Sequence, residues 1–194
     1  MTDAELAAHL AHIAGRLLLE VRDSGLISGK VLGDAGDKTA NQFLCHALRQ
    51  QRPEDGLLSE EEKDSAERLT KSRVWIVDPV DGTREYGEGR TDWAVHVALA
   101  IDGKPEIGAV GLPGLGVVLR SDQPAPLPAA STTPRMVVSR TRPAKEAIAV
   151  AEQIGAELVP MGSAGAKASR RVFFHWRSDW NISAMISTPM PIAR

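Results

Sequence analysis

The run Val74-Trp75-Ile76-Val77-Asp78-Pro79-Val80-Asp81-Gly82-Thr83 changes abruptly from apolar to acidic. Its first four residues are mostly β-branched and predict a short buried strand, which the Asp78-Pro79 pair ends. Asp78 and Asp81 then lie three residues apart across a turn that contains proline. Gly82 lets the backbone approach a ligand closely, and Thr83 supplies a hydroxyl group.

A second acidic group, Glu60-Glu61, comes from a separate segment, so up to four carboxylates could converge with Asp78 and Asp81. Hard oxygen ligands suit Mg²⁺ or Mn²⁺ better than Zn²⁺, and Mg²⁺ usually adds phosphate oxygens of a substrate to one or two carboxylates. A plain surface turn is the alternative, because Asp, Pro and Gly all favour turns. The preceding strand and the paired glutamates favour a metal and phosphate site.

Bulk composition limits the other classes of function. The chain has 194 residues, 43% of them hydrophobic, and a formal net charge of -2, so we expect a buried core and neither a nucleic-acid nor a membrane partner. Cys45 is the only cysteine, which excludes an internal disulfide and fits a reducing compartment. Since no stretch has the pattern of a signal peptide or a membrane span, a cytoplasmic protein is predicted.

Hydrophobic periodicity predicts mixed α and β structure. A capping box, Thr2 with Glu5, begins a helix that runs to about Val21. The glycine-rich stretch Asp23 to Gly36 predicts turns around a short extended piece, and a second helix is expected over Lys38 to Gln50. Later elements are expected as strands Trp93–Ile101, Ile107–Gly111, Gly116–Leu119, Met136–Ser139 and Leu158–Val159, and as a helix Pro143–Ile154. His96 is expected to be a structural strand residue.

Three motifs carry a family resemblance: Leu58-Ser59-Glu60-Glu61, Asp78 to Tyr86, and Gly162-Ser163-Ala164. Their order and spacing resemble those of the inositol-monophosphatase-like metal-dependent phosphatases. Thr83-Arg84-Glu85-Tyr86 further resembles the CysQ-type 3'(2'),5'-bisphosphate nucleotidase branch. The resemblance covers about Met1 to Ala168. It implies an α+β and α/β fold, the layered αβαβα sandwich of the inositol monophosphatase and fructose-1,6-bisphosphatase type.

The resemblance also implies a role for each motif residue. Two or more Mg²⁺ ions, or Mn²⁺, would be held by Glu61, Asp78, the Val80 carbonyl and Asp81. The substrate would be contacted by Asp81, Gly82, Thr83, Gly162 and Ser163. The catalytic residues would be Thr83, Asp81 and Glu61, acting through a metal-activated water. Glu60 and Asn41 would hold these residues in position without binding the metal directly.

The implied reaction is removal of the 3'-phosphate of adenosine 3',5'-bisphosphate or of 3'-phosphoadenylyl sulfate. Such an enzyme of sulfur metabolism is expected to be inhibited by lithium and to form a homodimer. Inositol monophosphatase or fructose-1,6-bisphosphatase activity is the alternative within the family. A catalytically inactive remnant and a structural or protein-binding module are alternatives of other classes.

The chain departs from the family pattern at two places. Thr39-Ala40-Asn41 stands where the family usually has Thr-Ala-Asp, and Asn41 can hold a water but cannot take its proton. Asp37 could substitute, although its position favours a helix start. After Ala168 the family's Trp-Asp motif is not recognisable. We therefore expect a metal- and phosphate-binding domain over residues 1–125, a partial α/β domain over 135–168 and a truncated or frameshifted, non-family tail over 169–194.

Overall fold

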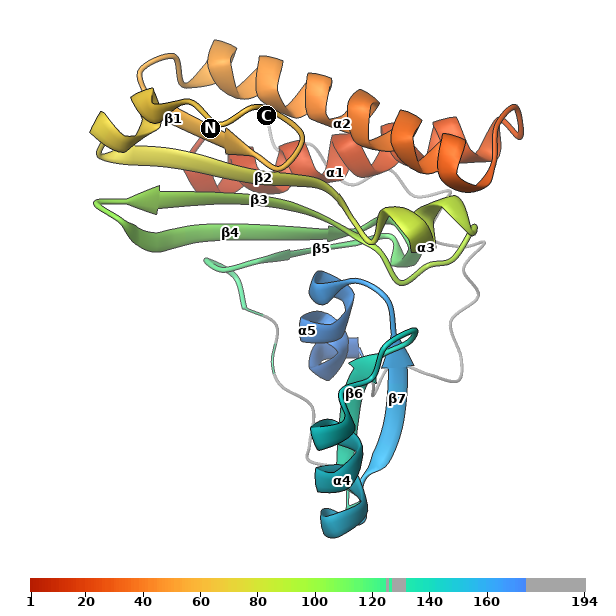
Figure 1. Cartoon of the computed structure of the whole chain (residues 1–194). Helices are drawn as coiled ribbons and strands as arrows, with labels where there is room; N and C mark the ends of the chain where they lie inside the picture. Colours follow the sequence, from red (N-terminus) through yellow and green to blue (C-terminus); the bar gives the residue numbers. More distant parts are fainter. Residues whose placement is uncertain (125, 127–131, 174–194) are drawn as a thin grey trace.

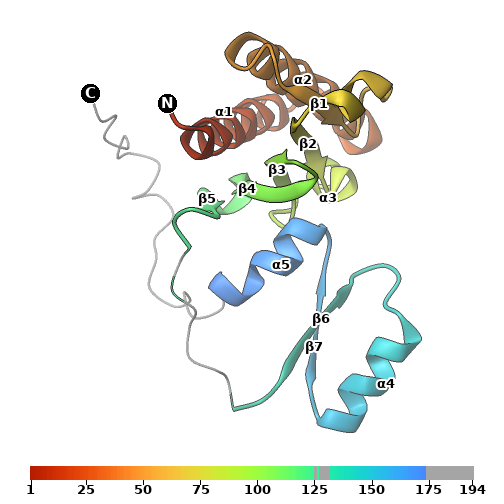
Figure 2. The same ribbon diagram turned by 90° about the vertical axis from the view of Figure 1, so that its left-hand side faces the viewer.

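The computed structural model describes residues 1–124, 126 and 132–173. Its elements stack in layers (Figure 1): a helix pair, α1 (Asp3–Asp23) and α2 (Gly29–Gln51), lies on a five-stranded sheet. Below that sheet follow α5 (Ala164–Phe173), a two-stranded sheet and α4 (Lys145–Ile154), in the same order in the turned view of Figure 2. This is the predicted αβαβα arrangement.

The larger sheet has the order β1-β2-β3-β4-β5. Its strands are β1 (Gly56–Ser59), β2 (Arg73–Asp81), β3 (Ala94–Ile101), β4 (Lys104–Leu112) and β5 (Val117–Arg120). β1 runs parallel to β2, and the other neighbours are antiparallel. The smaller sheet pairs β6 (Arg135–Ser139) with β7 (Glu157–Met161) in parallel. Three short helices complete the described elements: η1 (Ala66–Thr70), α3 (Thr83–Gly87) and η2 (Pro113–Leu115).

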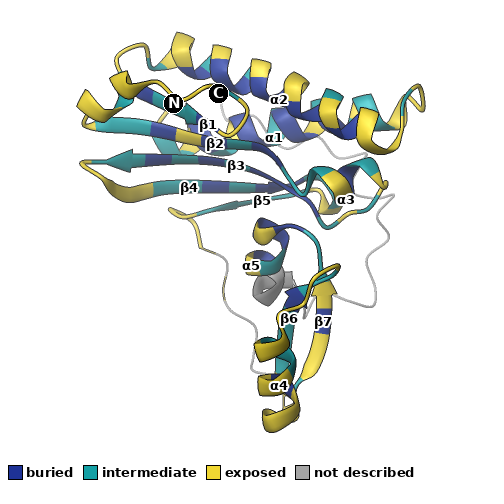
Figure 3. Cartoon of the chain, viewed as in Figure 1, coloured by how far each residue is buried: buried dark blue, intermediate teal, exposed yellow. Residues whose placement is uncertain are grey.

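The main core lies between the helix pair and the larger sheet. Side chains alternate between the two faces of a strand, so Trp75 and Val77 of β2 are buried while Ile76, on the opposite face, is 41% exposed. Figure 3 shows the contrast between this buried layer and the largely exposed α4 and β7. The face of β2 that points away from the helix pair is therefore the one available for a site.

The second helix begins nine residues before the predicted start, so the expected turns in this stretch are wrong. Gly33 and Gly36 lie inside α2, where glycine usually costs about 0.5–1 kcal/mol relative to alanine. A Cβ atom on Gly36 would be 2.5 Å from the Tyr86 ring, and one on Gly33 would be 2.8 Å from the Thr83 methyl group. These glycines allow α2 to pack directly against α3.

Tyr86, the last residue of the motif Asp78 to Tyr86, anchors this motif in the core. Its side chain is fully buried, its hydroxyl donates to the Leu18 carbonyl at 2.7 Å, and its ring meets Trp93 edge-on at 5.0 Å. The aromatic residue of the Thr83-to-Tyr86 motif therefore fastens α3 to α1. The side chain is not accessible from the surface.

The C-terminal part of the described chain differs from the predicted segmentation. α5 continues from Ala164 through Phe173, across the expected boundary at residue 168. Of the predicted tail, residues 174–194 lie outside the described part, and the proposed domain limits stay predictions. Within the described residues, no helix combines the length and apolar character that a membrane crossing requires.

Candidate active site

An irregularity in β2 decides where the motif carboxylates point. Asp78 pairs with His96 across the ladder to β3, Asp81 pairs with Ala94, and the register shifts between them. In a regular strand, residues three apart point to opposite faces. Pro79 cannot donate to the ladder, and a bulge redirects the side chains that follow it. Asp78 and Asp81 thus come to lie on the same side of the sheet.

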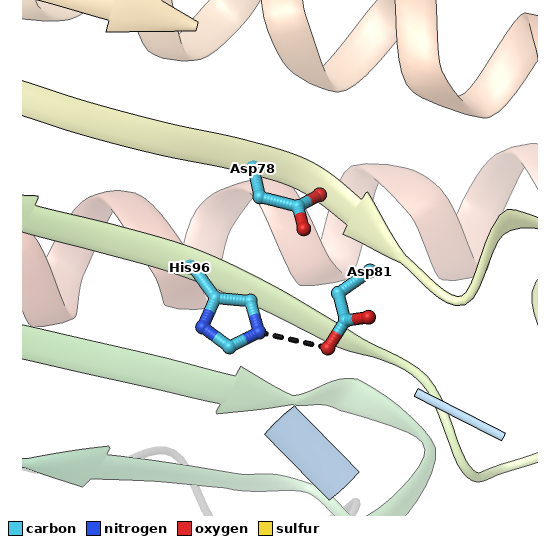
Figure 4. Close-up of side chains that lie close together, drawn as sticks. All are labelled: Asp78, Asp81 and His96. Atoms are coloured by element: carbon cyan, nitrogen blue, oxygen red, sulfur yellow. Dashed lines mark hydrogen bonds and ion pairs between the residues drawn. The ribbon is translucent and has the colours of Figure 1, made fainter. Parts of the chain in front are cut away.

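Asp78, Asp81 and His96 form a compact cluster (Figure 4). One ligand atom of each lies within 4.8 Å of the others, and His96 Nε2 is 3.0 Å from Asp81 Oδ2. The sequence prediction that Asp78 and Asp81 meet is therefore consistent with the structure. His96, expected to be purely structural, belongs to the cluster because it lies opposite Asp78 in the neighbouring strand. The sequence alone did not identify His96 as a member of the cluster, because its position depends on the pairing register of β2 and β3.

The two aspartates differ sharply in acidity. Burial raises the pKa of Asp78 to about 7, and the charges of Glu60 and Asp81 act in the same direction. Burial would also raise the pKa of Asp81, but hydrogen bonds from His96 and from backbone N–H groups of α5 outweigh it and lower the pKa to about 2. A divalent cation would relieve the repulsion among these carboxylates, so this set of donors fits such an ion.

Asp81 also connects the second and third sequence motifs. Its Oδ1 accepts from Ala164 N at 3.1 Å, and its Oδ2 accepts from Gly165 N at 2.6 Å. Gly82 has a φ of 93°, and a Cβ atom on it would be 2.9 Å from the Ser163 Cβ. Glycine is needed there both for its backbone conformation and for the close approach.

The third motif is held by backbone and side-chain bonds. Asp92 accepts from Gly162 N through its carboxylate at 2.8 Å and from Ser163 N through its carbonyl at 3.2 Å. The Ser163 side chain is buried, and its Oγ accepts from Ala166 N at 2.8 Å. Ser163 therefore caps α5, while substrate contacts by Gly162 and Ser163 stay predictions.

Asp37 lies at a position that the sequence did not predict. It lies in the middle of α2 and is buried, so the expectation that it begins a helix is wrong. Burial raises its pKa to about 6; the charges of Glu61 and Glu60 add to this, and a hydrogen bond from Thr83 opposes it. The Thr83 hydroxyl also lies 3.1 Å from the Val80 carbonyl, to which it can donate instead.

Asn41 is a buried residue of α2 that makes two side-chain hydrogen bonds. Its Oδ1 accepts from Ser59 Oγ at 2.6 Å and from Cys45 Sγ at 3.1 Å, and the side chain is buried. Asn41 therefore joins α2 to the end of β1, just before the glutamate pair. This supporting position leaves Asp37 as the carboxylate of α2 that contacts Thr83.

The paired glutamates raise the pKa of neighbouring acidic residues. Glu60 N donates to the Val77 carbonyl at 3.2 Å, which places Glu60 beside the end of β2. The Glu60 charge raises the pKa of Asp78 and of His96, and the charges of Glu61 and Glu60 both raise the pKa of Asp37. Glu60 thus acts on the cluster and on Asp37, and Glu61 acts on Asp37. The predicted division of roles, Glu61 as ligand and Glu60 as support, stays a prediction.

The sequence and the fold of this chain were both compared with those of known proteins. The sequence model of the inositol monophosphatase family matches residues 4–160. The chain is similar to a protein of Mycobacterium leprae named 3'-phosphoadenosine 5'-phosphate phosphatase, with 48% identity over 87% of this chain and 68% of that protein. It is equally similar, at 48%, to the protein of the same name from Mycobacterium bovis, over 80% of this chain and 62% of the relative.

The chain thus spans about two thirds of the length of these relatives. Among solved structures, CysQ from Bacteroides thetaiotaomicron superposes with a TM-score of 0.73 over 87% of this chain and 76% of that chain, at 22% identity. That likeness shows the fold, and the family match includes the acidic cluster. The chain belongs to the inositol monophosphatase family.

Proposed function

We propose that this chain is a divalent-metal-dependent phosphomonoesterase that removes the 3'-phosphate of adenosine 3',5'-bisphosphate. The observation that carries the proposal is the convergence of Asp78 and Asp81 on one side of β2, next to Thr83. The names of the mycobacterial relatives support the choice of substrate class. 3'-Phosphoadenylyl sulfate, which carries the same 3'-phosphate, is the proposed second substrate.

Mg²⁺ is the proposed ion, with Mn²⁺ as a substitute. Asp78 and Asp81 would hold it, together with Glu61 or Glu60 and the Val80 carbonyl. When bound, the ion supplies positive charge that stabilises the phosphate oxygens and makes a water molecule more acidic. Lithium is expected to inhibit by occupying one of the metal positions.

Asp37 and Thr83 form the proposed pair that prepares the attacking water. A carboxyl with a pKa of about 6 can accept a proton near neutral pH, which is what a general base requires. The Thr83 hydroxyl lies between this carboxylate and the Val80 carbonyl, so it can orient a water molecule toward phosphorus. Gly82 and Thr83 begin α3, and their backbone N–H groups are the proposed phosphate contacts.

The test is release of inorganic phosphate from adenosine 3',5'-bisphosphate by the purified chain, with and without Mg²⁺. We expect turnover that requires the metal, is lost in Asp78→Asn and is suppressed by lithium. The exposed Asp23→Asn variant is the matched control. Folded protein that binds the metal without releasing phosphate would refute the proposal and favour an inactive member of the family.

Substrate choice needs a parallel measurement. Inositol monophosphate and fructose 1,6-bisphosphate are offered under the same conditions, because family members share metal chemistry. A kcat/KM that is highest for either of these would show that the nucleotide assignment is wrong while leaving the phosphatase chemistry intact.

A further inference from the structure

Three consecutive glutamates, Glu60-Glu61-Glu62, follow β1, and the third differs from the first two in its contacts. Glu60 and Glu61 are exposed. The Glu62 side chain is only 29% exposed and is bound by α2, the helix that packs on β1 and β2 (Figure 1). Neither the proposed ligand set nor the Asp37–Thr83 pair includes Glu62.

The main partner of Glu62 is an arginine of α2. Arg49 Nη2 donates to Glu62 Oε2 at 2.5 Å, and Arg49 Nη1 donates to Glu62 Oε1 at 3.4 Å. Two parallel N–H bonds between a guanidinium and a carboxylate fix the direction of both groups. Arg49 lowers the pKa of this carboxyl, burial opposes that effect, and bonds from Cys45 and Asn41 add to it.

The three partners of Glu62 form one stripe along α2. Asn41, Cys45 and Arg49 are spaced by four residues, so they lie one above another on the same face of the helix. Asp37, the proposed general base, comes four residues before Asn41. The face of α2 that carries the base therefore also holds Glu62, about three helical turns further along.

The segment between β1 and Glu62 is a single tight turn. Glu62 N donates to the Ser59 carbonyl at 3.4 Å, and Glu61 N donates to Ser59 Oγ at 3.2 Å. Ser59 Oγ in turn donates to Asn41 Oδ1 at 2.6 Å. The two exposed glutamates therefore stand between two attachments, the end of β1 before them and Glu62 after them.

We propose that Glu62 is a positioning residue of the metal site: its bond to Arg49 holds the turn so that the two preceding glutamates face the acidic cluster and Asp37. The inference rests on the proposed function and extends it to a residue outside the ligand set. Removing a partner that orients metal ligands from behind typically weakens metal binding about ten- to a hundredfold. Glu62 would act in this way without contacting the ion.

Calorimetry of Mn²⁺ binding tests the inference without any turnover. We expect Glu62→Ala to weaken binding about tenfold or more. Glu54→Ala, which removes an exposed glutamate just before β1, is the matched control and should leave the affinity unchanged. Urea unfolding without metal checks that both variants are folded. An unchanged Mn²⁺ affinity in folded Glu62→Ala overturns the proposal.

A charge-swapped double variant separates positioning from direct metal binding. Combining Glu62→Arg with Arg49→Glu restores the ion pair in reverse, so it should recover most of the Mn²⁺ affinity that each single change loses. An arginine cannot bind a cation. A double variant that binds Mn²⁺ as weakly as Glu62→Ala would therefore indicate that Glu62 itself is a ligand, and would overturn the proposal.

The kinetic measurement depends on the proposed function. Phosphate release from adenosine 3',5'-bisphosphate is followed as the Mg²⁺ concentration is raised. Glu62→Ala should need about tenfold more Mg²⁺ for half of its maximal rate and should then reach a similar kcat. A lower kcat with an unchanged Mg²⁺ requirement overturns the positioning role. If the original chain releases no phosphate, the proposed function fails, and the Mn²⁺ affinities alone decide the role of Glu62.

Discussion

Asp78→Asn is expected to stabilise the metal-free protein while it abolishes metal binding. The pKa of Asp78 is about 7 against an ordinary 3.8, and each pKa unit corresponds to about 1.4 kcal/mol. The full difference would be about 4 kcal/mol. Because the side chain is partly solvated, screening reduces the expected gain to about 1–2 kcal/mol above pH 7.

The sign of the pH dependence follows from proton binding. Between the two pKa values the unfolded chain has lost the Asp78 proton and the folded protein keeps it, so the free energy of unfolding falls as pH rises from about 4 to 7. Asparagine removes this contribution. The advantage of the variant should therefore be full at pH 8, smaller at pH 5 and absent below about pH 4.

Urea unfolding of the metal-free protein at pH 5 and pH 8 measures the difference, with Asp23→Asn as the exposed control. Addition of Mg²⁺ or Mn²⁺ should stabilise the original chain and leave Asp78→Asn unchanged. If the variant were less stable than the original chain at pH 8, the burial and repulsion described for Asp78 would not be the main forces on it.

Three further changes test other parts of the site. Asp37→Asn should slow phosphate release about a hundredfold or more while metal binding measured by calorimetry persists, and an unchanged rate would remove Asp37 from the reaction. Gly82→Ala should lower the free energy of unfolding by about 1–3 kcal/mol in urea titrations, because its Cβ would meet Ser163 in a left-handed backbone conformation. Tyr86→Phe should cost about 0.5–1.5 kcal/mol by the same measurement, through loss of the bond to Leu18, and phosphate release at saturating substrate should be retained.

Local patterns predicted those features of the fold that depend on neighbouring residues. The capping box at Thr2 forms both of its bonds, with Glu5 N at 3.2 Å from Thr2 Oγ1 and Thr2 N at 2.8 Å from Glu5 Oε2. The predicted strand Val74–Val77 lies within β2, and the predicted strands Ile107–Gly111 and Gly116–Leu119 correspond to β4 and β5. The expected end of the first of these strands at Asp78-Pro79 is wrong, because β2 continues to Asp81. Caps, turns and apolar runs are encoded within a few residues, so a sequence states them directly.

Features that depend on distant residues were missed. Gly33 and Gly36 indicated turns by their own propensity, yet the packing of Thr83 and Tyr86 against them decides that they are helical. His96 joins the cluster only through its register with Asp78. Asp37 meets Thr83 only because α2 begins early and crosses α3. In each case tertiary contacts, which no local pattern contains, outweighed the residue's intrinsic preference.

The bond between Asp81 and the first turn of α5 has a consequence for how the molecule assembles. A helix usually finds acceptors for its first N–H groups within a few residues of its own start, but α5 receives two of them from a side chain more than eighty residues earlier. A fragment containing only β6, α4, β7 and α5 would lose these acceptors. The helix pair and larger sheet, in contrast, keep their core without α5. The first part of the chain can therefore serve as the template on which the start of α5 forms.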